Sequence, residues 1–178
     1  AGPGFINIVL RPEVLAEVAP EQDVHIVSNI QDPHPCDVPF DERQDMLFIG
    51  GFEHPPNVDA MLWFTSEILP LIHRRLPDVR LHIVGSKAPN TILQLNSEKT
   101  PVHGYVPDAD PFFRESRLSI APLRYGAGVK GKVNHSLAWG LPCVATTMAA
   151  EGMALQDGVD ILIADEAEAF ADAVIRLY

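Results

Sequence analysis

Short apolar runs alternate with helix-like segments along most of this chain. From Asp45 onward, the strand-like runs are MLFIG, RLHIVG, PVHGY, LSIAPL, LPCVAT and DILIA, with helical patterns between them. These runs are nearly continuous in apolar residues, which is typical of strands buried on both faces of a parallel sheet. The sequence therefore predicts an α/β fold with a doubly wound, Rossmann-like parallel sheet.

Two longer segments predict the main helices. The segment from 56 to 75 has apolar side chains at helical spacing, and we expect Asn57 to be its N-cap. Pro70 should kink or divide this helix, because proline has no amide hydrogen for an interior turn. The segment from Glu166 to the end has acidic residues in its first turn and one apolar side, which predicts an amphipathic helix packed on the core.

The charge balance restricts the partners that the chain can bind. Thirteen Lys and Arg residues stand against 24 Asp and Glu residues, which gives a net charge of -11. A surface that coats nucleic acid or an anionic membrane is not expected from such a balance. No apolar run approaches the roughly 18 residues that span a bilayer, so we expect no transmembrane segment and a cytoplasmic location. Two cysteines are too few for a disulfide framework, which favours a reducing compartment.

The first 44 residues differ from the rest. They contain a strand-like run, a helical stretch, a second strand-like run and a loop rich in proline, which is a linker signal. One helix and two strands are too few to form an independent core. Residues 1–44 are therefore either an extension of the main sheet or a remnant of a preceding domain plus a linker, and residues 45–178 form the main domain.

The stretch RYGAGVKGKVNHSLAWG, residues 124–140, is the strongest candidate for a binding site. It follows the run LSIAPL, which places it at the carboxyl edge of a parallel strand, where open α/β sheets bind ligands. Glycines let the backbone approach a ligand closely, and the next helix offers free amide groups to an anion. Its glycines and basic residues are Gly126, Gly128, Gly131, Arg124, Lys130 and Lys132. Together they predict a site for a phosphate or diphosphate.

Other interpretations of this stretch remain open. It matches the GxGxxG pattern, but the strand LPCVAT that follows does not end in the acidic residue that would hold a ribose. It also matches GxxxxGK of a nucleotide-hydrolysing P-loop, yet Val133 stands where that motif needs Ser or Thr. The alternative is a surface turn with solvated lysines, in which His135 is a helix residue bonded to a backbone carbonyl.

Two further glycine loops follow other predicted strands. Gly50 and Gly51 follow the first strand of the main domain, so this loop and residues 124–132 would face one cleft, unless the two glycines only turn the chain. Gly104, Tyr105 and Val106 follow the third strand and offer backbone groups and an aromatic ring to a nucleobase, unless Tyr105 is ordinary packing. The seven histidines have no metal-ligand spacing, and no nucleophile elbow occurs, so neither a metal site nor a catalytic residue is assigned.

Several blocks in this order resemble the C-terminal, donor-binding domain of a family-four-type retaining glycosyltransferase, which has the two-Rossmann-domain GT-B fold. The blocks are MLFIGGFEHPPNVDAMLWF, LPDVRLHIVGS, VHGYVPD, SIAPLRYGAGVKGKVNHSLAWGLPCVATTMAAEGM and DILIADEAEAFADAVIRLY. The resemblance covers about residues 45–178. It implies that this chain is the C-terminal half of such an enzyme and that residues 1–44 are the end of the preceding domain plus a linker.

The resemblance also implies the ligand and the partners. A nucleotide-diphosphate sugar donor would bind with its base near Gly104 to Val106, its diphosphate near Gly51 and residues 124–132, and its ribose near His135. No metal ion or other cofactor is expected. An acceptor-binding N-terminal domain of the same protein would complete an enzyme for cell-surface polysaccharide or glycoconjugate synthesis, in the cytoplasm or at the inner face of the membrane. The donor sugar and the acceptor stay open.

The chain departs from the family pattern at two positions. Two glutamates that commonly flank the glycine loop are replaced here by Ala127 and His135. These carboxylates are the family's usual contacts to the sugar and the ribose. An alternative to an active transferase is therefore a catalytically decayed module that keeps only nucleotide binding.

Overall fold

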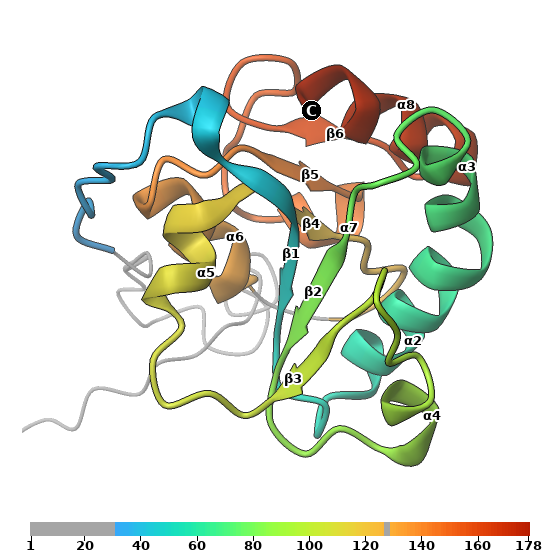
Figure 1. Cartoon of the computed structure of the whole chain (residues 1–178). Coiled ribbons are helices and arrows are strands. Elements are labelled where there is room, and N and C mark those ends of the chain that lie inside the picture. Colours follow the sequence, from blue (N-terminus) through green and yellow to red (C-terminus); the bar gives the residue numbers. More distant parts are fainter. Residues whose placement is uncertain (1–30, 127–128) are drawn as a thin grey trace, which may run out of the picture.

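The computed structural model describes residues 31–126 and 129–178, which contain a sheet of six parallel strands (Figure 1). The order across the sheet is β3-β2-β1-β4-β5-β6. The strands are β1 (Gln44–Ile49), β2 (Leu81–Val84), β3 (Val102–Gly104), β4 (Ser116–Ala121), β5 (Cys143–Ala145) and β6 (Leu162–Ile163). Each corresponds to one of the six predicted apolar runs, so the predicted Rossmann-like α/β fold is confirmed.

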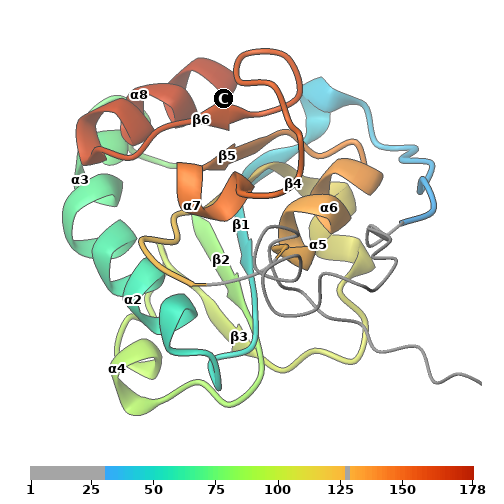
Figure 2. The ribbon, with the colours of Figure 1, turned by 180° about the vertical axis from the view of Figure 1, so that it is seen from behind.

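Helices cover both faces of the sheet. One face carries α2 (Pro55–Trp63), the π-helical turn η2 (Phe64–Ile68), α3 (Leu69–His73) and α8 (Ala167–Leu177). The other face carries α5 (Asp110–Glu115) and α6 (Gly131–Ala138), and the two groups of helices appear on opposite sides of the sheet in Figures 1 and 2. The short elements are η1 (Phe40–Glu42), α4 (Asn90–Leu93) and α7 (Thr147–Ala150). None of the helices in the described ranges has the length and apolar character that crossing a bilayer requires.

The side chains on the two faces of β1 belong to two separate apolar cores. Met46 and Phe48 belong to the larger core, which also includes Phe170 of α8. Leu47, which lies between them in sequence, belongs to the smaller core with Phe113 and other residues on the side of α5 and α6. All of these side chains are almost fully buried. Alternate residues of a strand point to opposite faces, so a doubly covered strand needs a continuous apolar run.

The predicted helix from 56 to 75 forms, with two differences in detail. It is divided, as expected, because the π-helical turn η2 separates α2 from α3 just before Pro70. The predicted N-cap is wrong, because α2 begins at Pro55 with His54 as its N-cap. Proline fits the first turn of a helix, where no partner for an amide hydrogen is needed. Asn57 is therefore an interior residue of the first turn, and its side chain is only 6% exposed.

The described part of the first segment lies against α5 and α6. The backbone amide of His34 donates to the Ala138 carbonyl at 2.8 Å. The His34 ring stacks on Trp139, with ring centroids 4.5 Å apart. Asp37 forms an ion pair with Arg114 of α5 at 2.6 Å. The strand-like and helical runs predicted before residue 31 lie outside the described residues.

The strand order places a topological switch point at β1. Strand β1 pairs with β2 on one side and with β4 on the other. The connections leaving β1 and β4 run to α2 and α6, which lie on opposite faces of the sheet. In open α/β sheets, the crevice outside the carboxyl ends of such strands is where ligands bind. The carboxyl ends of β1 and β4 therefore mark the edge at which a ligand site is expected.

Candidate functional site

A cavity of about 310 Å³ lies at this edge, between the end of β1 and the start of α6. It is lined by Ile49, Gly50, Gly51, His54, Asn57, Phe113, Gly131, Lys132 and His135. The loop after β1 and the first turns of α6 thus face one cavity, as the sequence predicted for two of the glycine loops. Among the described residues that line it there is no Asp or Glu, in a protein whose net charge is -11. This lining suits an anionic ligand.

The Lys132 ammonium is held by hydrogen bonds that end on the β1 loop. Its Nζ donates to Oδ1 of Asn57 at 2.5 Å. Nδ2 of the same Asn57 donates to the Gly51 carbonyl at 2.7 Å. Nζ also lies 4.3 Å from the centroid of the Phe48 ring, a cation–π distance. The side chains of two helices and the backbone of the β1 loop therefore meet at one ammonium group.

Gly50 makes room for this arrangement. A β-carbon at position 50 would lie 2.7 Å from the Lys132 Nζ and 2.9 Å from the Asn57 Nδ2, both closer than real contacts of this kind. The glycine is needed because of this close approach, since no positive φ is recorded for it. The sequence pattern is consistent with a turn at Gly50, and the structure adds a packing requirement.

The surroundings of the cavity change the pKa values of its basic groups. Burial lowers the pKa of Lys132 to about 7; the Lys130 charge acts in the same direction, and Cys143 opposes it. Burial also lowers the pKa of Lys130, against the opposing charge of Glu151. A diphosphate next to Lys132 would favour its charged form and raise this pKa again. Anion binding and protonation of Lys132 are therefore coupled.

His135 lines the cavity one turn after Lys132, with its ring against α5. It stacks on Phe113, with ring centroids 4.5 Å apart and an interplanar angle of 17°. Burial lowers the pKa of His135; His34 acts in the same direction and Asp110 opposes both. The neutral imidazole is thereby favoured, and it can offer one donor and one acceptor to a ligand hydroxyl group.

Arg124 is placed differently from the lysines. Its guanidinium forms two hydrogen bonds with the Asp59 carboxylate of α2, at 2.9 and 2.5 Å. It also lies over the Trp63 ring, at 5.4 Å from the centroid. Arg124 does not line the cavity. The structure therefore brings it to the surface of α2, where its charge already has a carboxylate partner.

The glycine loop itself is described only in part. Gly126 has a φ of +135° and lies against Pro56 at the start of α2, with Lys130 nearby. Lys130 is the N-cap of α6 and is 9% exposed. Gly128 and the neighbouring Ala127 lie outside the described residues. Val133 is completely buried, so the position where a P-loop carries its magnesium-binding hydroxyl faces the core.

The third predicted loop lies outside this cavity. Gly104 has a φ of +68°, and its carbonyl accepts a hydrogen bond from the Gly85 amide at 2.8 Å. Tyr105 is 75% exposed, and Val106 packs on the smaller core. None of these three residues lines the cavity of Lys132. Their predicted contact with a nucleobase stays a prediction.

Sequence reasoning missed four lining residues: Ile49, His54, Asn57 and Phe113. Asn57 was assigned to a helix cap, where its amide would bond only to nearby backbone. The available signal was the pair of prolines at positions 55 and 56, which favour a helix that starts earlier and leave Asn57 inside the first turn. Its contact with Lys132, 75 residues away, has no local signal.

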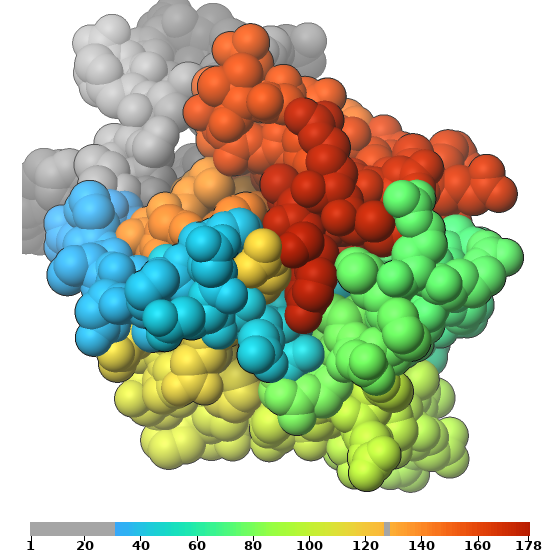
Figure 3. Space-filling view, turned by 45° about the horizontal axis from the view of Figure 1, so that its top comes forward, coloured from blue at the N-terminus to red at the C-terminus, as the bar shows by residue number. Residues whose placement is uncertain are grey.

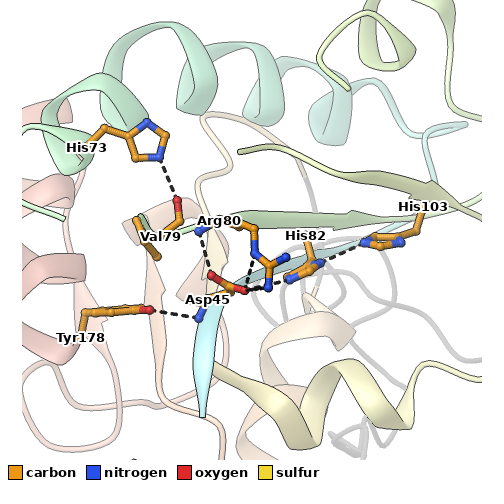
Figure 4. Close-up of polar contacts among 7 residues, drawn as sticks. All are labelled: Asp45, His73, Val79, Arg80, His82, His103 and Tyr178. Atoms are coloured by element: carbon orange, nitrogen blue, oxygen red, sulfur yellow. Dashed lines mark hydrogen bonds and ion pairs between the residues drawn. The ribbon is translucent and has the colours of Figure 1, made fainter. Parts of the chain in front are cut away.

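A second polar cluster lies at the opposite, amino edge of the sheet (Figure 4). The Asp45 carboxylate accepts hydrogen bonds from the Arg80 amide and Nε, both at 2.9 Å, and His82 Nε2 lies 3.2 Å from Oδ2. His82 Nδ1 is hydrogen-bonded in turn to Nε2 of His103 at 2.9 Å. Burial raises the pKa of Asp45, but bonds from His82 and Arg80 outweigh it and lower the pKa to about 2.

This amino-edge cluster also ties the ends of the domain together. The Asp45 amide donates to the Tyr178 hydroxyl oxygen at 3.2 Å. In Figure 3 the end of the dark red helix α8 lies against the cyan segment that leads into β1. A shallow cavity of about 280 Å³ beside Asp45 is lined partly by Glu42 and Glu115. The polar groups of the Asp45 cluster are mostly paired with one another, so the cluster stabilises the fold. In the described ranges, no group of three or more His, Cys, Asp or Glu side chains is arranged to hold a metal ion.

Comparisons with known proteins show which family this chain matches. The model of the family described as glycosyl transferases group 1 matches residues 43–178. The chain is also similar to an uncharacterized 44.6 kDa protein in the cps region of Klebsiella pneumoniae, with 24% identity over 154 residues. That alignment covers 82% of this chain and 38% of the relative, so the chain spans well under half of it.

Solved structures share the fold at low sequence identity. TarM superposes with a TM-score of 0.75 at 17% identity, over 95% of this chain and 35% of TarM. A UDP-forming trehalose-phosphate synthase from Burkholderia xenovorans superposes with a TM-score of 0.59 at 10% identity, over 78% of this chain and 37% of that chain. At these identities the likeness supports the arrangement of strands and helices and no more.

Proposed function

Because the chain belongs to the group 1 glycosyl transferase family, we propose that it binds a nucleotide-diphosphate sugar in the cavity between β1 and α6, for transfer of the sugar to an acceptor. The position of Lys132 carries this proposal. Its ammonium lies at the switch point of the sheet, in a cavity whose lining includes no carboxylate from residues 31–126 and 129–178. A charged donor fixed in a partly buried site binds a diphosphate more strongly than an exposed lysine would.

The same charge suits the chemistry of sugar transfer. When the bond between the sugar and the diphosphate breaks, negative charge develops on the departing diphosphate. Lys132 and Gly131, in the first turn of α6, line the cavity in which we place this group. Preorganised positive groups stabilise such charge without reorganisation. Their role is therefore to hold the donor and to stabilise the leaving group.

The solved relatives suggest which nucleotide to test first. A mutant of S. aureus TarM was solved in complex with UDP and α-GlcNAc-glycerol, among other ligands. The trehalose-phosphate synthase from Burkholderia xenovorans is described as UDP-forming. UDP is accordingly our first candidate for the nucleotide of this chain, with Tyr105 and Val106 as candidate contacts for its base.

The proposal extends to the rest of the protein. The chain spans 38% of its Klebsiella relative and 35% of TarM, and we assign the acceptor site to a further, N-terminal domain. Residues 1–44 would then be the end of that domain plus the linker. The relative's place in a cps region favours a role in polysaccharide synthesis.

A nucleotide-binding module without transfer activity is the second candidate. It is favoured by His135, which stands at a position where the family commonly has a glutamate. The cavity-lining residues that the structure describes also include no Asp or Glu. Both candidates require nucleotide binding, and only the first requires sugar transfer. An assay of sugar release from UDP-sugars and GDP-sugars by the full-length protein separates them.

Calorimetric titration with UDP, GDP and ADP, with and without magnesium, tests the donor site. We expect one nucleotide to bind without a metal requirement, and Lys132→Ala to weaken it by about 1–3 kcal/mol. Lys99→Ala is the matched control, because the Lys99 ammonium bonds to the Pro77 carbonyl outside the cavity. Equal affinities for the wild type and Lys132→Ala would refute the site.

A further inference from the structure

We propose that Asn57 is a positioning residue that holds the Lys132 ammonium in place for the donor diphosphate. This inference rests on the proposed function, because it concerns the same cavity. No catalytic step is assigned to Asn57. Its role is to connect the loop after β1 with the first turn of α6, so that the ammonium and the loop backbone face the ligand in one fixed geometry.

The hydrogen bonds of Asn57 favour positioning over direct ligand binding. Oδ1 accepts from Lys132 at 2.5 Å, and Nδ2 donates to the Gly51 carbonyl at 2.7 Å. The residue is only 6% exposed, so little of it is available to a ligand. Both ends of the side-chain amide thus have protein partners, one on each wall of the cavity.

Lys132 needs such a partner because of its own side chain. A lysine has four flexible carbons and loses considerable rotamer freedom when its ammonium is fixed. Asn57 from one side and the Phe48 ring, 4.3 Å from Nζ, from another restrict the ammonium to one place. The missing β-carbon of Gly50 leaves the space in which Asn57 and Lys132 meet. Three elements of the fold are therefore adapted to this single contact.

The charge of Lys132 also depends on Asn57, since no Asp or Glu of the described part of the chain lines this cavity. The titratable groups around the ammonium are Lys130 on the same chain turn, Cys143 on β5, and the cavity-lining His54 and His135. None of them is a carboxylate. Among the described side chains, the neutral Oδ1 of Asn57 accepts a hydrogen bond from this ammonium. A change at position 57 should therefore alter both the place and the protonation of Lys132.

Protonation gives a readout that a purely structural role would not move. A diphosphate binds the charged ammonium, so above the pKa of free Lys132 the complex must take up a proton. Nucleotide affinity should then fall by up to tenfold per pH unit above about pH 7, until the raised pKa in the complex is reached. The pH at which the fall begins reports the pKa of Lys132 in the free protein.

Two substitutions move this onset in opposite directions. Asn57→Asp keeps the size of the side chain and places a carboxylate next to the ammonium, which raises the pKa of Lys132, so the onset should rise by about one pH unit or more. Asn57→Leu removes both hydrogen bonds, so the onset should fall and the affinity at about pH 7 should drop about tenfold. Asn96→Ala is the matched control, because Asn96 bonds to the Val102 amide away from the cavity.

The experiment measures UDP affinity by calorimetry from about two pH units below to about two pH units above the wild-type onset. The titration of the Lys132 side chain is followed by NMR without ligand. Thermal melting shows that each variant is folded, and Asn57→Asp serves if Asn57→Leu does not fold. Opposite shifts of onset and NMR pKa, with no shift in Asn96→Ala, are expected. Variants that keep the wild-type onset while Lys132→Ala still weakens binding would overturn the role of Asn57 alone. Wild-type protein that binds no nucleotide would overturn this role and the proposed function together.

Discussion

The carbonyl group of Gly50 occupies the space in which the β-carbon of any other residue at position 85 would stand. The loops after β1 and β2 are packed backbone against backbone at this point, next to the candidate donor cavity. Gly50 in turn has the Lys132 and Asn57 side chains over it. The two glycines are thus required for different reasons, and substitutions separate them.

Gly85→Ala should destabilise the domain, by about 2–4 kcal/mol, because its new methyl group meets rigid backbone. Gly50→Ala should cost less stability, since it meets the ends of two side chains that can move, but it should displace Lys132 and weaken nucleotide binding about tenfold or more. Urea denaturation and calorimetry measure the two effects. Gly51→Ala is the stability control, with only Ser86 near its new methyl group, at 3.5 Å. Equal stability losses at positions 50 and 85 would contradict this distinction.

Arg124 should contribute less to nucleotide binding than Lys132 does. Its guanidinium is already paired with Asp59, and 48% of its side chain is exposed. We expect Arg124→Ala to change nucleotide affinity less than Lys132→Ala, and to lower stability by at most about 1 kcal/mol. Calorimetry on both variants at one pH tests the order. A larger loss in Arg124→Ala would mean that this side chain leaves Asp59 and joins the ligand site.

The Asp45 cluster should make the domain sensitive to acid. The pKa of Asp45 is about 2 in the fold, below its ordinary value of 3.8, so its stabilisation is complete above about pH 4 and is lost as the pH falls toward 2. The shift corresponds to about 2 kcal/mol. Asp45→Asn should remove it at pH 7 and flatten the acid limb of stability measured by urea denaturation.

Asparagine is the appropriate replacement because Asp45 has a φ of 66°, a conformation that asparagine tolerates. Asp37→Asn is the control, since Asp37 pairs with Arg114 at an exposed position. We expect it to leave the acid limb nearly unchanged. An Asp45→Asn variant with the wild-type pH profile would show that the carboxylate charge does not stabilise the fold.

The two cysteines should react at very different rates. Burial raises the pKa of the Cys143 thiol to about 11, although Ser119 and Lys132 oppose the shift. Cys36 is only partly buried, near the carbonyl of Arg114. Because the thiolate is the reactive form, a thiol reagent should modify Cys36 in the native protein and Cys143 only after unfolding. Peptide mass spectrometry identifies the modified residue, and rapid native labelling of Cys143 would contradict its burial.

The strands could be predicted from the sequence because burial on both faces leaves a local record. The doubly covered strand β1 is apolar at every position from Met46 to Ile49, and this run stands out in the sequence. The order of the strands leaves no such record. The order β3-β2-β1-β4-β5-β6 comes from the structure alone.

The candidate site was harder to predict because its contacts join residues that are distant in the chain. Arg124 was grouped with the lysines, since a basic residue in an acidic protein is conspicuous. Its partner Asp59, 65 residues earlier, gives no sign of the pairing in the sequence. For Asn57, the sequence predicts a helix cap and no part in the site. Only the folded chain brings its side chain to Lys132.

Strand β1 separates the Asp45 cluster from the candidate ligand site. Asp45 is its second residue and Gly50 follows its last, so about 16 Å of extended chain lies between the ion-paired edge and the ligand edge. Substitutions that far apart, with no shared partners, usually have additive effects on stability. Substitutions in the loop after β1 that change the ligand can therefore accumulate. They require no compensating change in the charges that stabilise the opposite edge.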